Sequence, residues 1–125
     1  MISEDLKIFL VEGYERLDDI ENALLAAETS PNDANLFNKM FRSFHTIKGN
    51  AGFLGLSEIE TVCHRGEALL DRLRSAKISF SSEIANVLLL VVDSLRQNFS
   101  SMEVDGESRQ GFGDTALSEL EQLLR

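Results

Sequence analysis

The stretch Phe41-Arg42-Ser43-Phe44-His45-Thr46-Ile47-Lys48-Gly49-Asn50-Ala51-Gly52 decides both the fold and the function predicted for this chain. Its apolar residues recur at steps of three and four, which is the spacing of one face of an α-helix. Extended at both ends, this face contains Leu36, Phe37, Met40, Phe44, Ile47, Ala51 and Leu54. At about 100° per residue it covers roughly one third of the helix, and His45 lies roughly 120° from its centre. The spacing therefore predicts a helix, capped by Asp33, that turns His45 towards solvent.

The neighbours of His45 distinguish it from an ordinary surface histidine. Lys48 follows three residues later and flanks the imidazole on the same side of the helix. Gly49 and Gly52 follow at four and seven residues, although glycine inside a helix costs roughly 1 kcal/mol relative to alanine. Two glycines beside one histidine indicate a surface kept clear for a partner or a phosphate group. Helix termination at Gly52 and close packing of another helix at Gly49 are the simpler explanations.

Further helices are predicted on both sides of this segment. The first helix begins at the N-cap Ser3 and ends near Ala27. The third helix follows an S-x-x-E capping box at Ser57 and Glu60 and ends before 77–80. The fourth helix begins at Ser81 or Ser82 and ends at Met102, and a short fifth helix is capped by Asp114. We therefore predict an all-α fold, an antiparallel four-helix bundle over residues 1–102. A flexible loop over 103–113 and a short fifth helix over 114–125, packed on or trailing the bundle, complete the prediction.

Composition and charge exclude several classes of protein. The chain has 125 residues, and its 12 basic and 21 acidic side chains give a net charge of −9. Such a surface repels nucleic acid and anionic lipid. The longest apolar run, Val87–Val92, is far shorter than the roughly 20 residues of a membrane span, and the first residues lack the pattern of a secretory signal. With a single cysteine, Cys63, no internal disulfide can form, so we expect a cytoplasmic protein.

The third predicted helix carries a second pair of polar residues, His64 and Glu67, at the edge of its apolar face. If this helix lies antiparallel to the one before it, Glu67 can reach the imidazole of His45. A solvated helix face is the simpler interpretation of Glu67, and spacing alone does not overturn it. A carboxylate that accepts from Nδ1–H fixes the tautomer and leaves Nε2 as a nucleophile. Lys48 and His64 could then neutralise an anionic group that arrives at Nε2.

Two residues near His45 are candidates for a docking surface. Phe41 lies at the edge of the apolar face on the side of His45, and Arg42 lies one helix position from that side. The simpler interpretations are that Phe41 contributes to the core and that Arg42 contributes to solubility. Cys63 lies on an apolar face and is interpreted as a buried core thiol.

The segment His45-Thr46-Ile47-Lys48-Gly49, followed by Gly52 and by Leu54-Gly55-Leu56, resembles the histidine-phosphotransfer (HPt) domain family. The similarity is greatest to the amino-terminal phosphotransfer domain of CheA chemotaxis kinases, in which an H-[ST]-x-K-G signature carries the phosphorylated histidine. The run Cys63-His64-Arg65-Gly66-Glu67 resembles the segment that bears the supporting His and Glu. The layout matches over the whole chain, whereas specific residues match only in the second and third helices.

The resemblance implies a complete mechanism. His45 is expected to take a phosphoryl group from ATP held by a separate histidine kinase catalytic domain, in the same polypeptide or its dimer mate. Glu67 is expected to accept from Nδ1, Lys48 and His64 to stabilise the phosphoryl charge, and the glycines to leave room. The group then passes to an aspartate of a response regulator receiver domain. ATP and Mg²⁺ are expected at the kinase partner and Mg²⁺ at the receiver, with no cofactor and no metal bound by this segment.

Other interpretations of the sequence stay open. There is no G-x-x-x-x-G-K-[ST] loop and no nucleotide-binding box, so the segment is expected to be a carrier rather than an enzyme. It is either an amino-terminal module of a longer histidine kinase or a stand-alone phosphotransfer protein. A non-catalytic interaction or scaffold bundle is one alternative. A metal-binding or redox bundle is another, although the Glu-x-x-His spacing of di-iron bundles does not occur.

Overall fold

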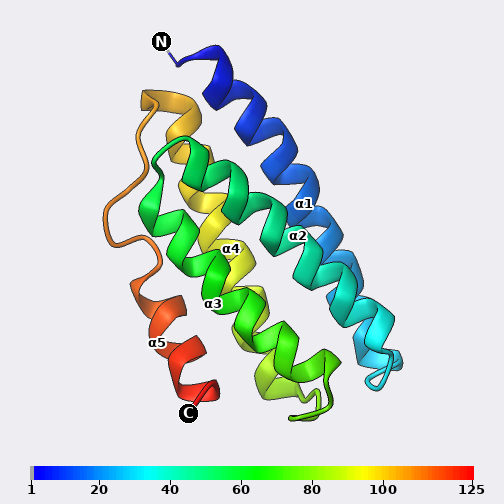
Figure 1. The fold of residues 1–125 in the computed structure, drawn as a ribbon. Helices are drawn as coiled ribbons and strands as arrows, with labels where there is room; N and C mark the ends of the chain where they lie inside the picture. Colours follow the sequence, from blue (N-terminus) through cyan, green and yellow to red (C-terminus); the bar gives the residue numbers. More distant parts are fainter. Residues whose placement is uncertain (1) are drawn as a thin grey trace.

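The computed structural model describes residues 2–125, and these form a bundle of α-helices (Figure 1). The helices are α1 (Glu4–Thr29), α2 (Ala34–Phe53), α3 (Ser57–Arg74), α4 (Ser82–Asp105) and α5 (Asp114–Leu123). Successive long helices run in opposite directions, as their short connections require. The predicted all-α bundle with a short fifth helix is confirmed.

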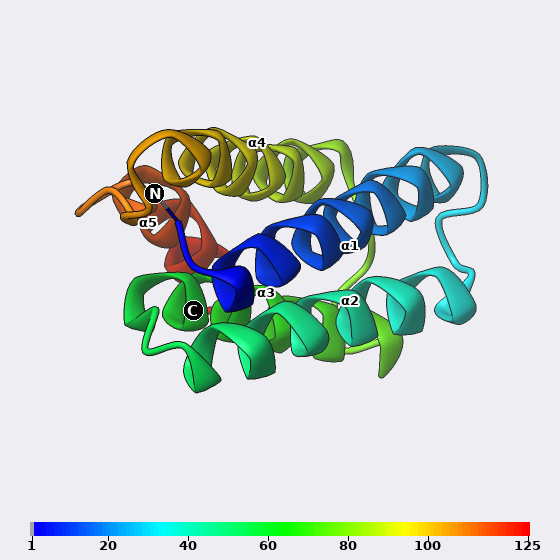
Figure 2. The same cartoon turned by 90° about the horizontal axis from the view of Figure 1, so that it is seen from above.

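The helices enclose one apolar core. Viewed from above, α1 lies beside both α2 and α4, and α2 lies beside α3 (Figure 2). The short α5 packs on both α3 and α4, two helices that make little direct contact with each other. The predicted stripe of α2 faces inward: Phe37, Met40, Phe44, Ile47 and Ala51 are buried. Within residues 2–125, no helix has the length and apolarity that crossing a membrane requires.

The turn between α2 and α3 differs from the predicted capping box. Helix α2 ends in a Schellman motif, in which Gly55 has φ +73° and the Leu56 amide donates to the Ala51 carbonyl at 2.8 Å. Leu56 is thereby also the N-cap of α3, so Ser57 is already the first helical residue. No side chain caps α3, and the predicted cap by Ser57 with Glu60 is wrong.

Two boundaries near the carboxyl end also differ from the prediction. Helix α4 continues to Asp105, three residues into the predicted loop, and ends where Gly106 adopts φ +79°. Gly113, and not Asp114, is the N-cap of α5. A Cβ at Gly113 would lie 2.6 Å from Val62 Cγ2, so close packing against α3 favours glycine at this cap. Ser3, Asp33 and Ser81 cap α1, α2 and α4 as predicted.

Gly13 lets α1 pack closely against Phe99 of α4. A Cβ at this position would lie 2.7 Å from Cε2 of Phe99, a fully buried ring packed edge-on against Phe9 and Tyr14. We expect Gly13→Ala to destabilise the domain by about 1 kcal/mol, because overpacking costs about 1–3 kcal/mol while the helix propensity of alanine returns at most about 1 kcal/mol. Urea unfolding measures the change, and an unchanged or raised midpoint would show that Phe99 can move aside.

Candidate functional site

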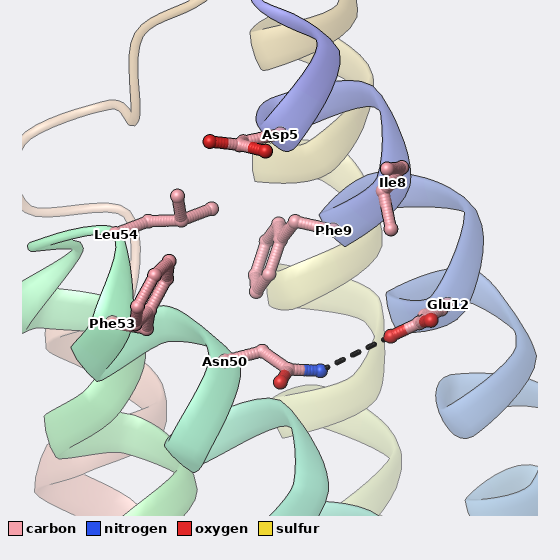
Figure 3. A pocket seen from close by; sticks show the side chains of 7 residues that line it. All are labelled: Asp5, Ile8, Phe9, Glu12, Asn50, Phe53 and Leu54. Atoms are coloured by element: carbon pink, nitrogen blue, oxygen red, sulfur yellow. Dashed lines mark hydrogen bonds between the residues drawn. The ribbon is translucent and has the colours of Figure 1, made fainter.

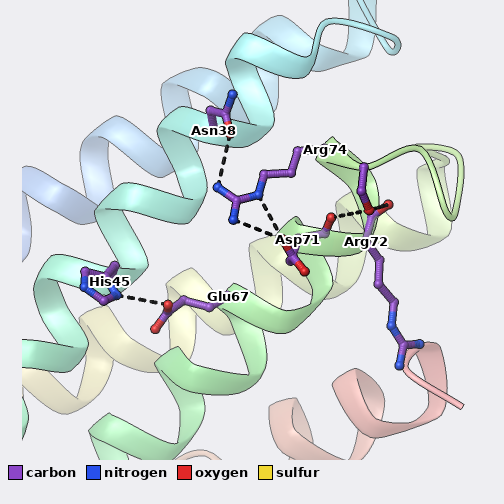
Figure 4. A network of polar contacts seen from close by, with 7 residues as sticks. Asn38, His45, Glu67, Asp71, Arg72 and Arg74 are labelled. Carbon is purple, nitrogen blue, oxygen red and sulfur yellow. Dashed lines mark hydrogen bonds and ion pairs between the residues drawn. The ribbon is translucent and has the colours of Figure 1, made fainter.

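His45 and Glu67 meet across the α2–α3 interface. The Nδ1 atom of His45 lies 3.1 Å from Oε2 of Glu67 (Figure 4). The carboxylate can only accept, so in the neutral ring Nδ1 carries the proton and Nε2 carries the free electron pair. The His45 side chain is 64% exposed and that of Glu67 only 7%. The pair therefore combines an accessible ring with a buried acceptor.

Lys48 binds the other oxygen of the same carboxylate. Its Nζ lies 2.6 Å from Glu67 Oε1, and its side chain is 24% exposed. The contact is an ion pair rather than an aligned hydrogen bond, because Oε1 has no hydrogen-bond donor in bonding geometry. The sequence placed Lys48 next to His45 correctly, but it did not reveal this ion pair. A buried carboxylate requires such a counter-charge.

The close approach of α2 and α3 explains how Glu67 reaches His45. Gly66 precedes Glu67 and is buried, and a Cβ there would lie 3.1–3.2 Å from three atoms of the Phe44 ring. Phe44 itself precedes His45 and is fully buried. The contact between Gly66 and Phe44 thus sets the distance between the two helices immediately beside the polar pair.

Phe41 and Arg74 complete the surroundings of the imidazole. The Phe41 ring is half-buried and nearly parallel to that of His45, with an interplanar angle of 8° and centroids 6.2 Å apart. The guanidinium carbon of Arg74 lies 3.8 Å from the centroid of the Phe41 ring. Sequence reasoning missed Arg74 because it lies in the last turn of α3, and no local pattern connects it with α2.

The remaining candidate residues surround the site. His64 is exposed and lines a shallow depression with Lys48, Glu60, Thr61 and Arg65. Gly49 is exposed, and a Cβ there would meet nothing within 4 Å. At Gly52, by contrast, a Cβ would lie 2.8 Å from Glu60 Oε2, so part of its space is already occupied within the domain. Arg42 is exposed and lines a different groove, between α1 and α2.

Another hollow lies between the start of α1 and the end of α2. Its apolar wall contains Ile8, Phe9, Phe53 and Leu54 (Figure 3). Asn50 crosses it and donates to Glu12 Oε2 at 3.3 Å. None of the titratable residues of the His45 site lines this hollow. No group of three or more His, Cys, Asp or Glu residues suited to a metal ion occurs in the described residues 2–125.

Cys63 lies fully buried in α3, as predicted. Burial raises the pKa of its thiol, the nearby Glu67 carboxylate raises it further, and Lys48 acts in the opposite direction. The native domain therefore keeps a proton that the unfolded chain loses above its ordinary pKa of about 8.5.

Because of this difference in bound protons, the free energy of unfolding depends on pH in the alkaline range. The native state binds more protons than the unfolded state, so the free energy of unfolding falls as pH rises above about 8.5, by at most about 1.4 kcal/mol per pH unit for this one group. We expect Cys63→Ala to remove this component. Urea unfolding of both proteins between pH 7 and 10 measures it, and parallel pH profiles would contradict the prediction. Tyr14, whose pKa burial raises to about 12, is common to both proteins.

Comparison with known proteins places this chain in a family. Residues 5–98 match the model of the Hpt domain, and the chain therefore belongs to the Hpt domain family. It is an Hpt domain of the CheA type, a phosphoryl carrier. It is 33% identical over 95 residues to the sensor histidine kinase CheAY of Helicobacter pylori, covering 76% of this chain and 12% of that protein. It is 28% identical over 102 residues to the chemotaxis protein CheA of Halobacterium salinarum, covering 82% of this chain and 15% of that protein. The chain thus spans a small part of these curated relatives.

A solved structure agrees with this assignment along nearly the full chain. It is the phosphorylated P1 domain of CheA3 in complex with CheY6 from R. sphaeroides, with a TM-score of 0.88 and 30% identity, covering 97% of this chain and 95% of that one. The CheA phosphotransferase domain from Thermotoga maritima gives a TM-score of 0.77 and 32% identity, covering 80% of this chain and 97% of that one.

Proposed function

We propose that His45 is the phosphoacceptor of this domain and that Nε2 is the atom that carries the phosphoryl group. The observation that carries the proposal is the hydrogen bond from Nδ1–H to the buried Glu67, 3.1 Å long, on a ring that is otherwise exposed. This bond leaves the electron pair on Nε2, at the opposite edge of the ring. A nucleophile so oriented can reach a large donor such as a nucleotide held by another domain.

The transfer steps follow from this arrangement. The Nε2 electron pair attacks the γ-phosphorus of ATP, the bond from that phosphorus to the bridging oxygen breaks, and ADP leaves with the electron pair. The ring retains its Nδ1 proton and gains positive charge, which the Glu67 carboxylate stabilises. In the second transfer a receiver carboxylate attacks the phosphorus, the N–P bond breaks, and its electron pair returns to Nε2.

Lys48 and His64 are the proposed sources of positive charge for the phosphoryl oxygens. Lys48 is only partly exposed and pairs with Glu67, so it balances the carboxylate and the incoming anion together. His64 is exposed and lines the same depression as Lys48. Phe41 and Arg42 are proposed to contact the partner proteins, since each lines a groove that opens next to α2.

The proposed partners supply the phosphoryl donor and the phosphoryl acceptor. A histidine kinase catalytic domain, in the same polypeptide or its dimer mate, would hold ATP and Mg²⁺, and a receiver domain of a response regulator would hold Mg²⁺ beside its aspartate. The relative from R. sphaeroides, solved in complex with CheY6, supports a receiver partner. We therefore propose that this segment alone is a carrier without enzymatic activity or bound cofactor, working in the cytoplasm as part of a CheA-type kinase.

The test is transfer of label from ATP. The domain is mixed with the catalytic core of a CheA-type kinase and radiolabelled ATP, and the label is followed into an added receiver domain. Acid-labile, base-stable label that the receiver then removes is the expected result. Absence of label with a core shown to be active on another Hpt domain would contradict the proposal and favour a scaffold bundle.

Gly49 provides a separate test of partner access. Because a Cβ at this position would meet nothing within 4 Å, the fold itself gives no reason for glycine. We expect Gly49→Ala to stabilise the domain by up to about 1 kcal/mol. Gly49→Leu is expected to keep that stability yet slow phosphotransfer, because its side chain projects beside His45. Normal transfer rates in Gly49→Leu would show that partners do not need this space.

A further inference from the structure

Arg74 is connected to His45 through Phe41, although it does not contact the imidazole itself. Its guanidinium lies over the Phe41 ring at 3.8 Å, and that ring lies nearly parallel to the imidazole at 8°. The three groups thus form a continuous series from the last turn of α3 to the middle of α2. Phe41 precedes His45 by one helical turn, so the two rings are neighbours on the same helix.

Arg74 is itself fixed in place from two helices. Its Nε donates to Asp71 Oδ1 at 3.0 Å, and Nη2 lies 3.0 Å from the same oxygen. Its Nη1 donates to Asn38 Oδ1 on α2 at 3.2 Å (Figure 4). The guanidinium therefore spans the gap between α3 and α2, and its charge is largely balanced by Asp71. Its planar face, rather than its charge, remains available to the Phe41 ring.

An exposed imidazole needs a neighbouring group that restricts its rotation. With 64% of its side chain exposed, His45 has little packing that would oppose rotation about its side-chain bonds. Rotation breaks the bond to Glu67 and moves the electron pair of Nε2 away from the approach path. A flat ring beside the imidazole reduces the number of orientations that the imidazole can adopt, and the guanidinium of Arg74, stacked on the Phe41 ring, limits the movement of that ring.

We infer that Arg74 is a positioning residue for phosphotransfer. It holds the Phe41 ring parallel to the imidazole, and this ring keeps His45 oriented towards Glu67. The inference rests on the proposed role of His45. Arg74 lies outside the histidine signature and outside the His64–Glu67 segment. Since the interaction acts through a ring plane, Lys at position 74 should not replace Arg, whereas Tyr at position 41 should replace Phe.

The first experiment measures the ring without any partner. Two-bond ¹H–¹⁵N correlation spectra of the isolated domain report which nitrogen of His45 carries the proton. We expect a predominantly Nδ1-protonated ring in the wild type, and a mixture of tautomers in Arg74→Ala and Arg74→Lys. Arg109→Ala, which also removes a surface arginine paired with an aspartate, is the matched control and should resemble the wild type. Circular dichroism verifies that each variant is folded.

The second experiment measures the reaction with phosphoramidate, a small phosphoryl donor that needs no kinase domain. Nε2 attacks phosphorus, the P–N bond of the donor breaks, and ammonia leaves after taking up a proton from water. We expect Arg74→Ala to slow this reaction about three- to tenfold. This is a smaller effect than the loss of about 10²-fold that a 1 Å misplacement of a reacting group can cause. Phe41→Leu should slow it similarly, Phe41→Tyr should not, and the double variant should be no slower than Phe41→Leu.

Three outcomes would overturn the inference. One is an unchanged His45 tautomer in folded Arg74→Ala. Another is additive slowing in the double variant, which would mean that Arg74 and Phe41 act independently. A third is full activity in Arg74→Lys, which would assign the role to charge. Failure of the proposed function itself is distinguished by the wild type, which would then take up no phosphate at His45 from any donor.

Discussion

Replacing His45 with glutamine is expected to abolish phosphorylation of the domain while leaving its fold intact. The phosphoryl group needs an imidazole nitrogen, and an amide nitrogen has no available electron pair with which to attack phosphorus. The side chain is 64% exposed, so its loss removes little buried surface. Glu67 keeps its ion pair with Lys48. We expect the free energy of unfolding to change by less than about 1 kcal/mol.

The measurement combines labelling from ATP with thermal unfolding. His64→Gln is the matched control, because it removes the other exposed histidine of the site and should retain label at a reduced rate. Label that persists in His45→Gln and disappears in His64→Gln would move the phosphoacceptor to α3. A melting temperature lowered by more than about 8 °C would indicate that His45 has a structural role.

Replacing Glu67 with glutamine is expected to slow phosphorylation about 10- to 100-fold without abolishing it. A hydrogen bond to a charged group contributes about 1.5–3 kcal/mol, and each 1.4 kcal/mol in the barrier changes the rate tenfold. Glutamine retains the shape of the side chain but loses the charge that stabilises the imidazolium. It can also turn its NH₂ group towards Nδ1, which favours the tautomer protonated at Nε2.

Glu60→Gln is the control for the Glu67 variant. Glu60 lies on the same helix two turns earlier and is exposed. It lines the depression with Lys48 and His64 but forms no hydrogen bond or ion pair with His45, so it tests the effect of a nearby charge alone. Single-turnover phosphorylation by the kinase core measures both variants. Equal rates for Glu67→Gln and the wild type would remove the role of Glu67 in the chemistry, and equal slowing by both variants would indicate a general charge effect.

The sequence predicted the helices because they depend on local spacing, and it predicted the central pair of the site from spacing together with the resemblance to Hpt domains. The steps of three and four placed Phe44 and Ile47 inside and His45 outside, as the structure confirms. Spacing allowed Glu67 to reach His45 only if α2 and α3 lie antiparallel, as they do, and the family resemblance assigned Glu67 to the imidazole.

Features that depend on tertiary contacts were not predictable in the same way. The capping box failed at Ser57 because the Schellman turn of α2 made Leu56 the N-cap. Arg74 reaches Asn38 from a position 36 residues away, and no spacing rule connects them. The ion pair of Lys48 with Glu67 depends on the burial of the carboxylate, which only the packed helices establish.

The tight turn at Gly55 affects how the site forms during folding. Because α2 and α3 follow one another directly, the residues that hold and surround His45, from Asn38 to Arg74, come from one helical hairpin. Contacts between segments close in sequence form early and quickly during folding, since little chain entropy is lost in closing the loop. The reactive geometry is therefore a property of a local unit. Helices α1, α4 and α5 contribute the buried residues that stabilise this hairpin, whereas the side chains that contact and orient His45 come from α2 and α3.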